Sequence, residues 1–272
     1  MNNHKEETTA GDCCADGHDA PALKLEDALA RILAEVKPVT GVETIPVRAA
    51  LGRVLAEDVV SPIDVPAHTN SAMDGYALRG VDLQADAETR LDVIGVAAAG
   101  RPFDGAVGAG QCVRILTGAP VPEGADTVVM QERVTREDDA AIIAVGQKPG
   151  QHVRQAGEDI ARGAVALAAG AVLLPAALGM LASVGVGELN VRRRARVAFF
   201  STGDELRRVG EPLGAGQIYD SNGYTIHGML TRAGVEIVDM GLVRDDPADI
   251  ENAFADAAAR ADAIVTSGGV SV

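Results

Sequence analysis

Three short polar segments near the C-terminal end of the sequence combine residue types that could bind a phosphorylated ligand. The segments are STGDE after the apolar run RVAFF, RDD after VEIVDMGLV, and SGGVS after ADAIVT. Glycine amides and hydroxyls can cradle a phosphate without lysine, and carboxylates beside them favour a hard cation such as Mg²⁺. The candidate groups are Ser201, Thr202, Gly203, Asp204, Glu205, Asp245, Asp246, Ser267, Gly268, Gly269 and Ser271.

The elements around these segments would bring them to one edge of a sheet. Continuous apolar runs alternate with helical patterns over 220–233 and 245–261, which predicts a βαβαβ unit with an open parallel sheet. Ligands of such sheets bind beyond the carboxyl ends of the strands. The expected helix boundaries are a cap at Asp220, Ser221 or Asn222, an end at Gly234, a second cap at Asp246 and Pro247 in the first turn.

A simpler interpretation is that Asp245 and Asp246 only cap the helix and that Glu205 is solvated. For one carboxylate alone that interpretation is favoured, and the convergence of three turns on one edge reverses the preference. The sequence contains no G-x-G-x-x-G, no G-x-x-x-x-G-K-[ST] and no G-x-S-x-G motif. A standard dinucleotide site, a P-loop and an α/β-hydrolase are therefore not supported.

The remaining sequence predicts a multidomain protein that combines α/β and mostly-β parts. Residues 1–21 are polar and predict a disordered tail, and a helical stripe runs from Leu25 to Val36 before Pro38. Strand-like runs at 53–61, 91–98, 112–118, 126–134, 140–146 and 164–174 are separated by turn residues. The expected domains are a helical and extended linker region (22–65 and 165–194), a mostly-β domain (66–164) and an incomplete α/β domain (195–272).

The composition argues against some classes of binding partner and indicates the cellular compartment. The chain has 39 acidic and 24 basic side chains, a net charge of −15, and only four lysines, which argues against nucleic acid or an anionic membrane. Its three cysteines form no disulfide framework, and neither a secretory signal nor an apolar run of membrane-spanning length is present. We therefore expect a cytoplasmic protein. His4, Cys13, Cys14 and His18 lack the spacing of a zinc site, and their role stays open.

Three upstream segments also carry polar residues in rigid turns. They are NSAMDGYAL, which contains Asp74, TGAPVPEGAD, which begins at Thr117, and RQAGEDI, which contains Glu158 and Asp159. Each segment taken alone is most simply a turn. In order along the chain, however, NSAMDGYA, RILTGAPVPEGADTVVMQE, GEDI, STGDEL, IYDSN, GLVRDDP and TSGGVSV resemble the molybdopterin molybdenumtransferase family, which includes the gephyrin E-domain. The resemblance covers about residues 23–272.

The resemblance implies functional roles for particular residues. It assigns the family's acidic and threonine positions to Asp74, Thr117, Asp159, Glu205 and Asp245, of which Glu205 and Asp245 are also candidates for binding Mg²⁺. The substrate-binding positions expected around them are Ser201, Thr202, Gly203, Asp220, Asn222, Ser267, Gly268, Gly269 and Ser271.

The family inserts molybdate into adenylylated molybdopterin and releases AMP, with Mg²⁺, and this reaction is the function that the resemblance implies. It also implies a homodimer in which the β-rich domain of one subunit approaches the pterin site of the other, and contact with the adenylyltransferase of the pathway. The family continues past GGVSV with an acidic residue, a lysine-bearing segment and a β-barrel domain, so we expect groups that bind molybdate to lie beyond Val272. A non-catalytic molybdopterin-binding or scaffold module is the main alternative. Another enzyme on the same α/β unit is disfavoured, because NSAMDGYA and TGAPVP lie outside that unit.

Overall fold

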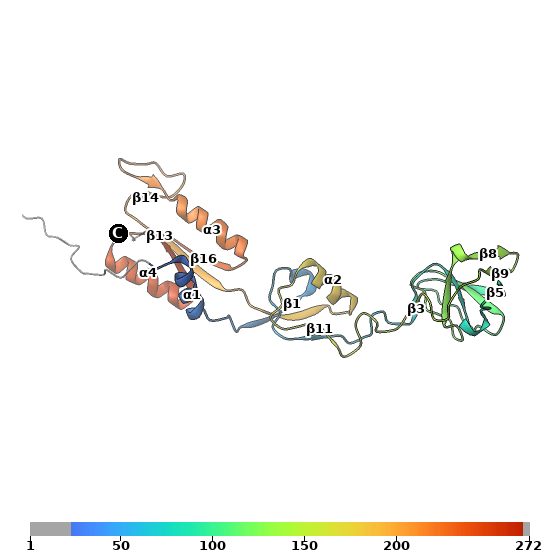
Figure 1. Ribbon diagram of the computed structural model, residues 1–272. Helices are drawn as coiled ribbons and strands as arrows, with labels where there is room; N and C mark the ends of the chain where they lie inside the picture. Colours follow the sequence, from blue (N-terminus) through green and yellow to red (C-terminus); the bar gives the residue numbers. More distant parts are fainter. Residues whose placement is uncertain (1–22, 269–272) are drawn as a thin grey trace, which may run out of the picture. The chain divides into compact units, whose positions relative to one another are not determined.

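The computed structural model describes residues 23–268, which belong to two compact units, one ending at Pro38 and the other beginning at Val39. The first contains α1 (Leu25–Glu35), labelled in Figure 1, and none of its residues is buried. The predicted helix is thereby confirmed, and Val36 follows it in an extended conformation, two residues before Pro38. The predicted tail, with His4, Cys13, Cys14 and His18, lies outside the described residues.

Three parallel strands form the sheet that carries the predicted edge site. They are β13 (Arg196–Thr202), β16 (Glu236–Val243) and β17 (Ala263–Ser267), in the order β16-β13-β17. The connecting helices are α3 (Ser221–Ala233) and α4 (Pro247–Arg260). The predicted βαβαβ alternation and the parallel sheet are confirmed.

Helices cover both faces of this sheet (Figure 1). The ring of Phe199 packs edge-to-face with that of His227 on α3, with ring centroids 6.4 Å apart, and the ring of Phe200 packs in the same way with that of Phe254 on α4, with centroids 5.2 Å apart. Successive strand residues point to opposite faces, so α3 and α4 lie on opposite sides. Burial on both faces explains why RVAFF is continuously apolar rather than alternating.

The helix boundaries agree with the capping residues expected from the sequence. The Asp220 carboxylate accepts a hydrogen bond from the Gly223 amide at 2.9 Å, and Gly234 ends α3 in the left-handed conformation with φ 72°. The Asp246 carboxylate accepts hydrogen bonds from the amides of Ala248 and Asp249. These contacts satisfy amides that a helix start leaves without an intrahelical partner.

The prediction that STGDEL forms a turn is partly wrong, because its first two residues, Ser201 and Thr202, still belong to β13. Ser201 is paired with Leu242 on one side and with Ser267 on the other. Thr202 is paired with Val243 of β16, so ladder pairing extends the strand beyond the apolar run. The turn begins at Gly203, and β14 (Leu206–Arg207) then pairs in parallel with β15 (Ile218–Tyr219).

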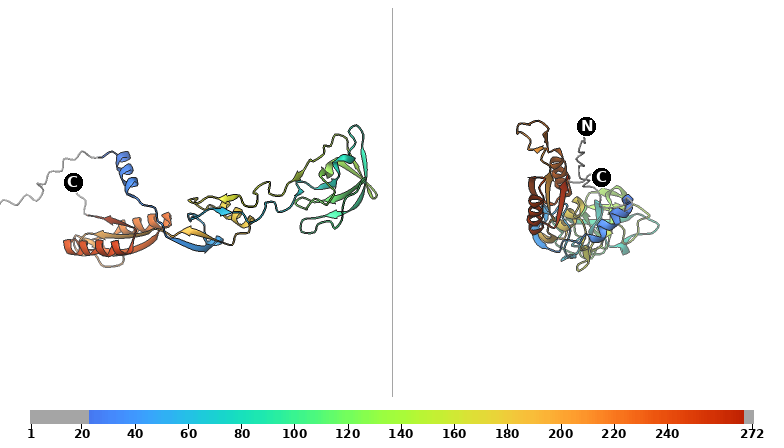
Figure 2. Two further views of the ribbon diagram at one scale, coloured as in Figure 1. Left: turned by 90° about the horizontal axis from the view of Figure 1, so that it is seen from below. Right: turned by 90° about the vertical axis from the view of Figure 1, so that its left-hand side faces the viewer.

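A six-stranded sheet in the order β7-β4-β6-β5-β9-β8 occupies the predicted mostly-β region. Figure 2 shows it in cyan to green, curled on itself. Its strands are β4 (Gly75–Leu78), β5 (Thr89–Ala97), β6 (Gln111–Ile115), β7 (Thr127–Met130), β8 (Val134–Glu137) and β9 (Ala140–Ile143). Neighbouring residues enter different core clusters: Cys112 packs with Tyr76 and Leu78, whereas Val113 packs with Ala77. Both faces of this sheet are therefore packed. A short 3-10 helix (Gly80–Asp82) follows β4.

Two of the predicted strand-like runs are interrupted. The run at 126–134 divides into β7, which pairs with β4, and β8, which pairs with β9, around a 3-10 helix (Gln131–Arg133). The run at 53–61 forms only β2 (Val59–Val60), while Val54 and Leu55 make single bridges to Val172 and Val191. Their partners come from different segments, so no continuous strand results.

The predicted linker region pairs its two separate sequence segments. Strand β1 (Val42–Pro46) pairs antiparallel with β12 (Glu188–Arg192), and β2 pairs with β11 (Val165–Leu167), which is much shorter than the run predicted at 164–174. Leu55, Leu173, Leu181 and Val191 are fully buried in its core. The remaining elements are a 3-10 helix (Val47–Ala49), α2 (Pro175–Ser183), and β3 (Asn70–Ser71) paired with β10 (Val153–Arg154). The predicted domain boundaries themselves stay a prediction.

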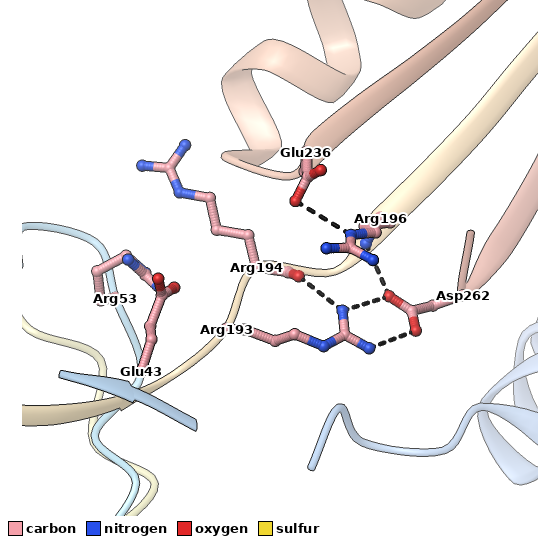
Figure 3. Close-up of polar contacts among 7 residues, drawn as sticks. All are labelled: Glu43, Arg53, Arg193, Arg194, Arg196, Glu236 and Asp262. Atoms are coloured by element: carbon pink, nitrogen blue, oxygen red, sulfur yellow. Dashed lines mark hydrogen bonds and ion pairs between the residues drawn. The ribbon is translucent and has the colours of Figure 1, made fainter. Parts of the chain in front are cut away.

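An ion pair holds the chain where it enters β13 (Figure 3). The two terminal guanidinium nitrogens of Arg193, Nη1 and Nη2, donate to the Asp262 carboxylate at 2.7 and 2.6 Å, and the Arg196 amide donates to the same carboxylate at 2.8 Å. The Arg193 amide donates to the Gly41 carbonyl, just before β1. Asp262 directly precedes β17, so this contact joins the starts of two sheet strands. The pKa of Asp262 lies well below its usual range because hydrogen bonds from the Arg193 guanidinium and the Arg196 amide favour the ionised carboxylate.

Candidate functional site

The carboxyl ends of the three parallel strands meet at one edge, as the sequence predicts. The chain leaves β13 for β16 on one side and then returns to β17 on the other side. The strand order therefore reverses at β13, and the crevice beyond such a reversal is where open α/β sheets bind ligands. The residues at this crevice are Ser201, Thr202, Gly203, Arg244, Asp245, Ser267 and Gly268.

The turn after β17 lies directly against the end of β13. Gly268 has φ 105°, and a Cβ at this position would lie 2.5 Å from the carbonyl oxygen of Thr202. The same Cβ would lie 2.7 Å from the Thr202 hydroxyl, which also approaches the Ser267 carbonyl at 3.5 Å. Only glycine permits this approach without displacing one of the two segments. The predicted residues Gly269 and Ser271 lie outside the described residues.

The hydroxyl of Ser201 is an unsatisfied polar group at the end of the central strand. The residue is 1 % exposed, and its Oγ has no hydrogen-bond partner within residues 23–268. A buried hydroxyl without a partner costs about 1–3 kcal/mol, so a partner outside the described residues or a ligand would stabilise it.

The turns after β13 and β16 are also connected. The Asp204 carboxylate accepts a long hydrogen bond from the Asp245 amide at 3.4 Å. The Glu205 carboxylate lies close to Gly203, where a Cβ would approach it to 2.6 Å. The side chains of Glu205 and Asp245 are both exposed. The structure therefore brings Gly203, Glu205 and Asp245 to the same edge and leaves the two carboxylates accessible.

Two cavities open beside these turns. The first has a volume of about 470 Å³ and extends between the ends of β13 and β16; it is lined by Gly203, Asp204, Leu206, Arg207, Arg208, Glu211, Leu242, Val243 and Arg244. The second, of about 650 Å³, lies on the α3 side and shares Arg208 and Leu242 with the first. Asp220 lines this second cavity while it caps α3, and the exposed Asn222 lines neither.

A second polar constellation lies on the six-stranded sheet. The Asp74 carboxylate accepts hydrogen bonds from the Thr117 amide at 2.8 Å and from the Thr117 hydroxyl at 2.7 Å. Asp74 directly precedes β4, and Thr117 follows β6, which pairs antiparallel with β4, so the two residues meet at one end of the pair. Donation by the Thr117 amide and then by its hydroxyl lowers the pKa of Asp74.

Asp159 belongs to a separate ion pair. Its carboxylate accepts from Arg154, which also pairs with Glu158, and the two carboxylates raise the pKa of Arg154. No hydrogen bond joins Asp159 to Asp74 or Thr117 within the described part of the chain. The sequence interpretation did not identify Arg154 as the partner of Asp159, although it lies five residues away.

Comparison with known proteins finds family models that match both parts of the chain in which these residues lie. A family model described as the MoeA N-terminal region, domains I and II, matches residues 23–185, and one described as a probable molybdopterin binding domain matches residues 198–272. The chain belongs to the molybdopterin molybdenumtransferase family. It is 45% identical to the molybdopterin molybdenumtransferase of Haemophilus influenzae, covering 92% of this chain and 62% of that protein. It is 40% identical to that of a Nostoc species, covering 85% of this chain and 53% of the relative.

The fold agrees with this family. A crystal structure of a molybdopterin biosynthesis MoeA protein from Pyrococcus horikoshii matches with a TM-score of 0.83 at 33% identity, covering 90% of this chain and 66% of that one. The resemblance found in the sequence motifs is therefore confirmed. The chain spans about half to two thirds of the length of the molybdenumtransferases that it matches.

Two further observations concern metal and membrane. Among residues 23–268, no group of three or more His, Cys, Asp and Glu side chains is placed to hold a metal ion. Mg²⁺ commonly uses only one or two carboxylates together with substrate phosphates, and Glu205 and Asp245 supply oxygen donors of that kind. No helix in the described part of the chain has the length and apolar character needed to cross a bilayer.

Proposed function

We propose that this chain takes part in inserting molybdate into adenylylated molybdopterin, with release of AMP. The observation that carries the proposal is the reversal of strand order at β13, with the accessible carboxylates of Glu205 and Asp245 beside glycine turns. Membership of the molybdopterin molybdenumtransferase family supplies the substrate class. The protein's contribution is chiefly to position reactants and stabilise charge, since the sulfur ligands of molybdenum belong to the pterin.

Different residues at the carboxyl ends of the parallel strands bind different parts of the substrate. The amides of Gly203 and Gly268 and the hydroxyls of Ser201, Thr202 and Ser267 hold phosphate oxygens of the substrate. Glycine at 203 and 268 also permits close approach, because a side chain would collide with Glu205 or Thr202. Gly269 and Ser271 extend the same glycine turn in the sequence. Asp220 and Asn222, at the start of α3, bind the part of the substrate farther from the phosphates.

Mg²⁺ would be held by Glu205 and Asp245 together with substrate phosphate oxygens. The ion would offset the charge of phosphate next to these carboxylates, which otherwise would repel it. Its removal by a chelator is expected to weaken substrate binding.

Asp74, Thr117 and Asp159 form the second part of the proposed machinery. The two hydrogen bonds from Thr117 keep Asp74 ionised and oriented, and Arg154 holds Asp159. In a homodimer, the six-stranded sheet of one subunit would approach the pterin site of the other and bring these residues to the substrate. We propose this assembly, a cytoplasmic location and contact with the adenylyltransferase of the pathway from family membership.

Titration with molybdopterin-AMP followed by molybdate tests the function. The expected result is saturable binding and release of AMP that depends on molybdate. Binding without AMP release would identify the chain as a non-catalytic molybdopterin-binding module, the second candidate. Absence of binding would refute the proposal.

A further inference from the structure

Arg114 and Gln131 come from the two ends of the segment RILTGAPVPEGADTVVMQE and contact each other beside Asp74. The Arg114 guanidinium donates a hydrogen bond from Nη2 to Oε1 of Gln131 at 3.0 Å. The Gln131 amide in turn donates to the Asp74 carbonyl oxygen at 3.0 Å. Two hydrogen bonds in series therefore connect the Arg114 side chain with the main chain of Asp74.

The Arg114 side chain reaches Gln131 by crossing the central strand β4. Arg114 lies on β6 opposite Tyr76 of β4, whereas Gln131 directly follows β7, which pairs with β4 on its other side. The guanidinium carbon of Arg114 lies 5.9 Å from the centre of the Tyr76 ring, and Tyr76 is only 3% exposed. A cation over an aromatic face is attracted by the quadrupole of the ring. The buried ring thus holds the guanidinium over β4, two residues along the chain from Asp74.

The positive charge of Arg114 is not neutralised by an ion pair. The side chain is half-buried, and no carboxylate lies within ion-pair distance of it among residues 23–268. A charge that is partly removed from water acts more strongly on ionisable groups near it. The amide and the hydroxyl of Thr117 lower the pKa of Asp74 most, and the positive charge of Arg114 lowers it further.

We propose that Arg114 is a positioning residue, which acts through Gln131 to fix the main chain that presents the Asp74 carboxylate. Thr117 follows β6 and Gln131 follows β7, so Asp74 is held from both strands that flank β4. Thr117 orients the carboxylate itself, and the contact of Arg114 with Gln131 holds the backbone from which that carboxylate projects. This role rests on the proposed function, in which Asp74 belongs to the reaction machinery.

Hydrogen exchange of the Gln131 amide tests the role, because this amide makes the contact with the Asp74 carbonyl. Arg114→Gln and Gln131→Leu should each accelerate its exchange roughly tenfold, since a hydrogen bond from a charged group is lost. The double variant should exchange no faster than either single variant, because both changes remove the same contact. Arg114→Gln should also raise the pKa of Asp74 in carbon-detected NMR, since a positive charge is removed.

Arg133→Gln is the matched control. Arg133 ends the 3-10 helix that begins at Gln131, and its side chain is exposed and has no hydrogen bond or ion pair within the described part of the chain. Its amide exchange and its Asp74 pKa should match those of the unmodified chain. Thermal unfolding of each variant checks the fold, and Gln131→Leu supplies the same comparison if Arg114→Gln is unstable.

The outcomes separate this role from the proposed reaction. Unchanged exchange of the Gln131 amide in Arg114→Gln, or additive effects in the double variant, would overturn the role of Arg114. So would normal molybdate-dependent AMP release by Arg114→Gln, which we expect to fall roughly tenfold. If amide exchange accelerates as expected while the unmodified chain releases no AMP, the contact of Arg114 with Gln131 stands and the proposed reaction fails.

Discussion

Replacing Gly268 by alanine should disrupt the edge site by displacing the turn after β17 from the end of β13. The new Cβ would lie 2.5 Å from the Thr202 carbonyl oxygen, roughly 1 Å closer than an optimal contact of about 3.5 Å. Gly268 also has φ 105°, a conformation that costs a residue with a side chain about 1–3 kcal/mol. If substrate binds only the undisturbed turn, that cost lowers the affinity by roughly 5- to 150-fold.

The assay is a titration of Gly268→Ala with molybdopterin-AMP, accompanied by thermal unfolding. Gly228→Ala is the matched control, because Gly228 lies within α3 and a Cβ there would meet nothing within 4 Å. Alanine in the interior of a helix stabilises it by roughly 0.5–1 kcal/mol relative to glycine, so this control should bind normally. An affinity of Gly268→Ala within twofold of the unmodified chain would refute the inferred role of this turn.

Further variants probe the second constellation, the core and the ion pair. Thr117→Val removes one of two donors to Asp74, so carbon-detected NMR should find the pKa of Asp74 raised but still below its usual range, whereas Thr117→Ser should leave it unchanged. Phe200→Ala should cost about 3–5 kcal/mol of unfolding free energy in denaturant titrations, because Phe200 is fully buried, and a loss under 1 kcal/mol would contradict its place in the core. The folded pKa of Asp262 is lowered, so its stabilising effect is full above its ordinary value of 3.8 and is lost as pH falls; the difference in melting temperature from Asp262→Asn should shrink on acidification. Burial raises the pKa of Cys112 to about 12, so mass spectrometry should find it alkylated by iodoacetamide at pH 8 only after denaturation.

The sequence was sufficient for features that depend on local residue patterns. Continuous apolar runs identified β13, β16 and β17 because strands buried on both faces do not alternate. Asp246 was expected as a helix cap, and Asp220 was one of three candidates with Ser221 and Asn222, because such side chains can accept from amides two or three residues ahead. The convergence of the three turns follows from parallel strand order, which the alternation of strands and helices requires.

Features that depend on partners distant in the sequence could not be predicted from local residue patterns. The contact between Asp74 and Thr117 arises from the pairing of β4 with β6, which no local pattern specifies. The run at 53–61 does not form one continuous strand, because Val54 and Leu55 are bridged to different segments and only Val59–Val60 forms a strand. The cavity lined by Arg208 and Arg244 exists only because β16 lies beside β13.

The most direct test of the edge site is the affinity and turnover of Asp245→Asn with molybdopterin-AMP, molybdate and Mg²⁺. Glu251→Gln is its control, since Glu251 is an exposed carboxylate on α4 away from the strand ends. We expect Asp245→Asn to lower molybdate-dependent AMP release at least tenfold with an unchanged melting temperature, and Glu251→Gln to have no effect. Normal AMP release by Asp245→Asn would contradict the assignment of the substrate site to the carboxyl ends of the parallel strands.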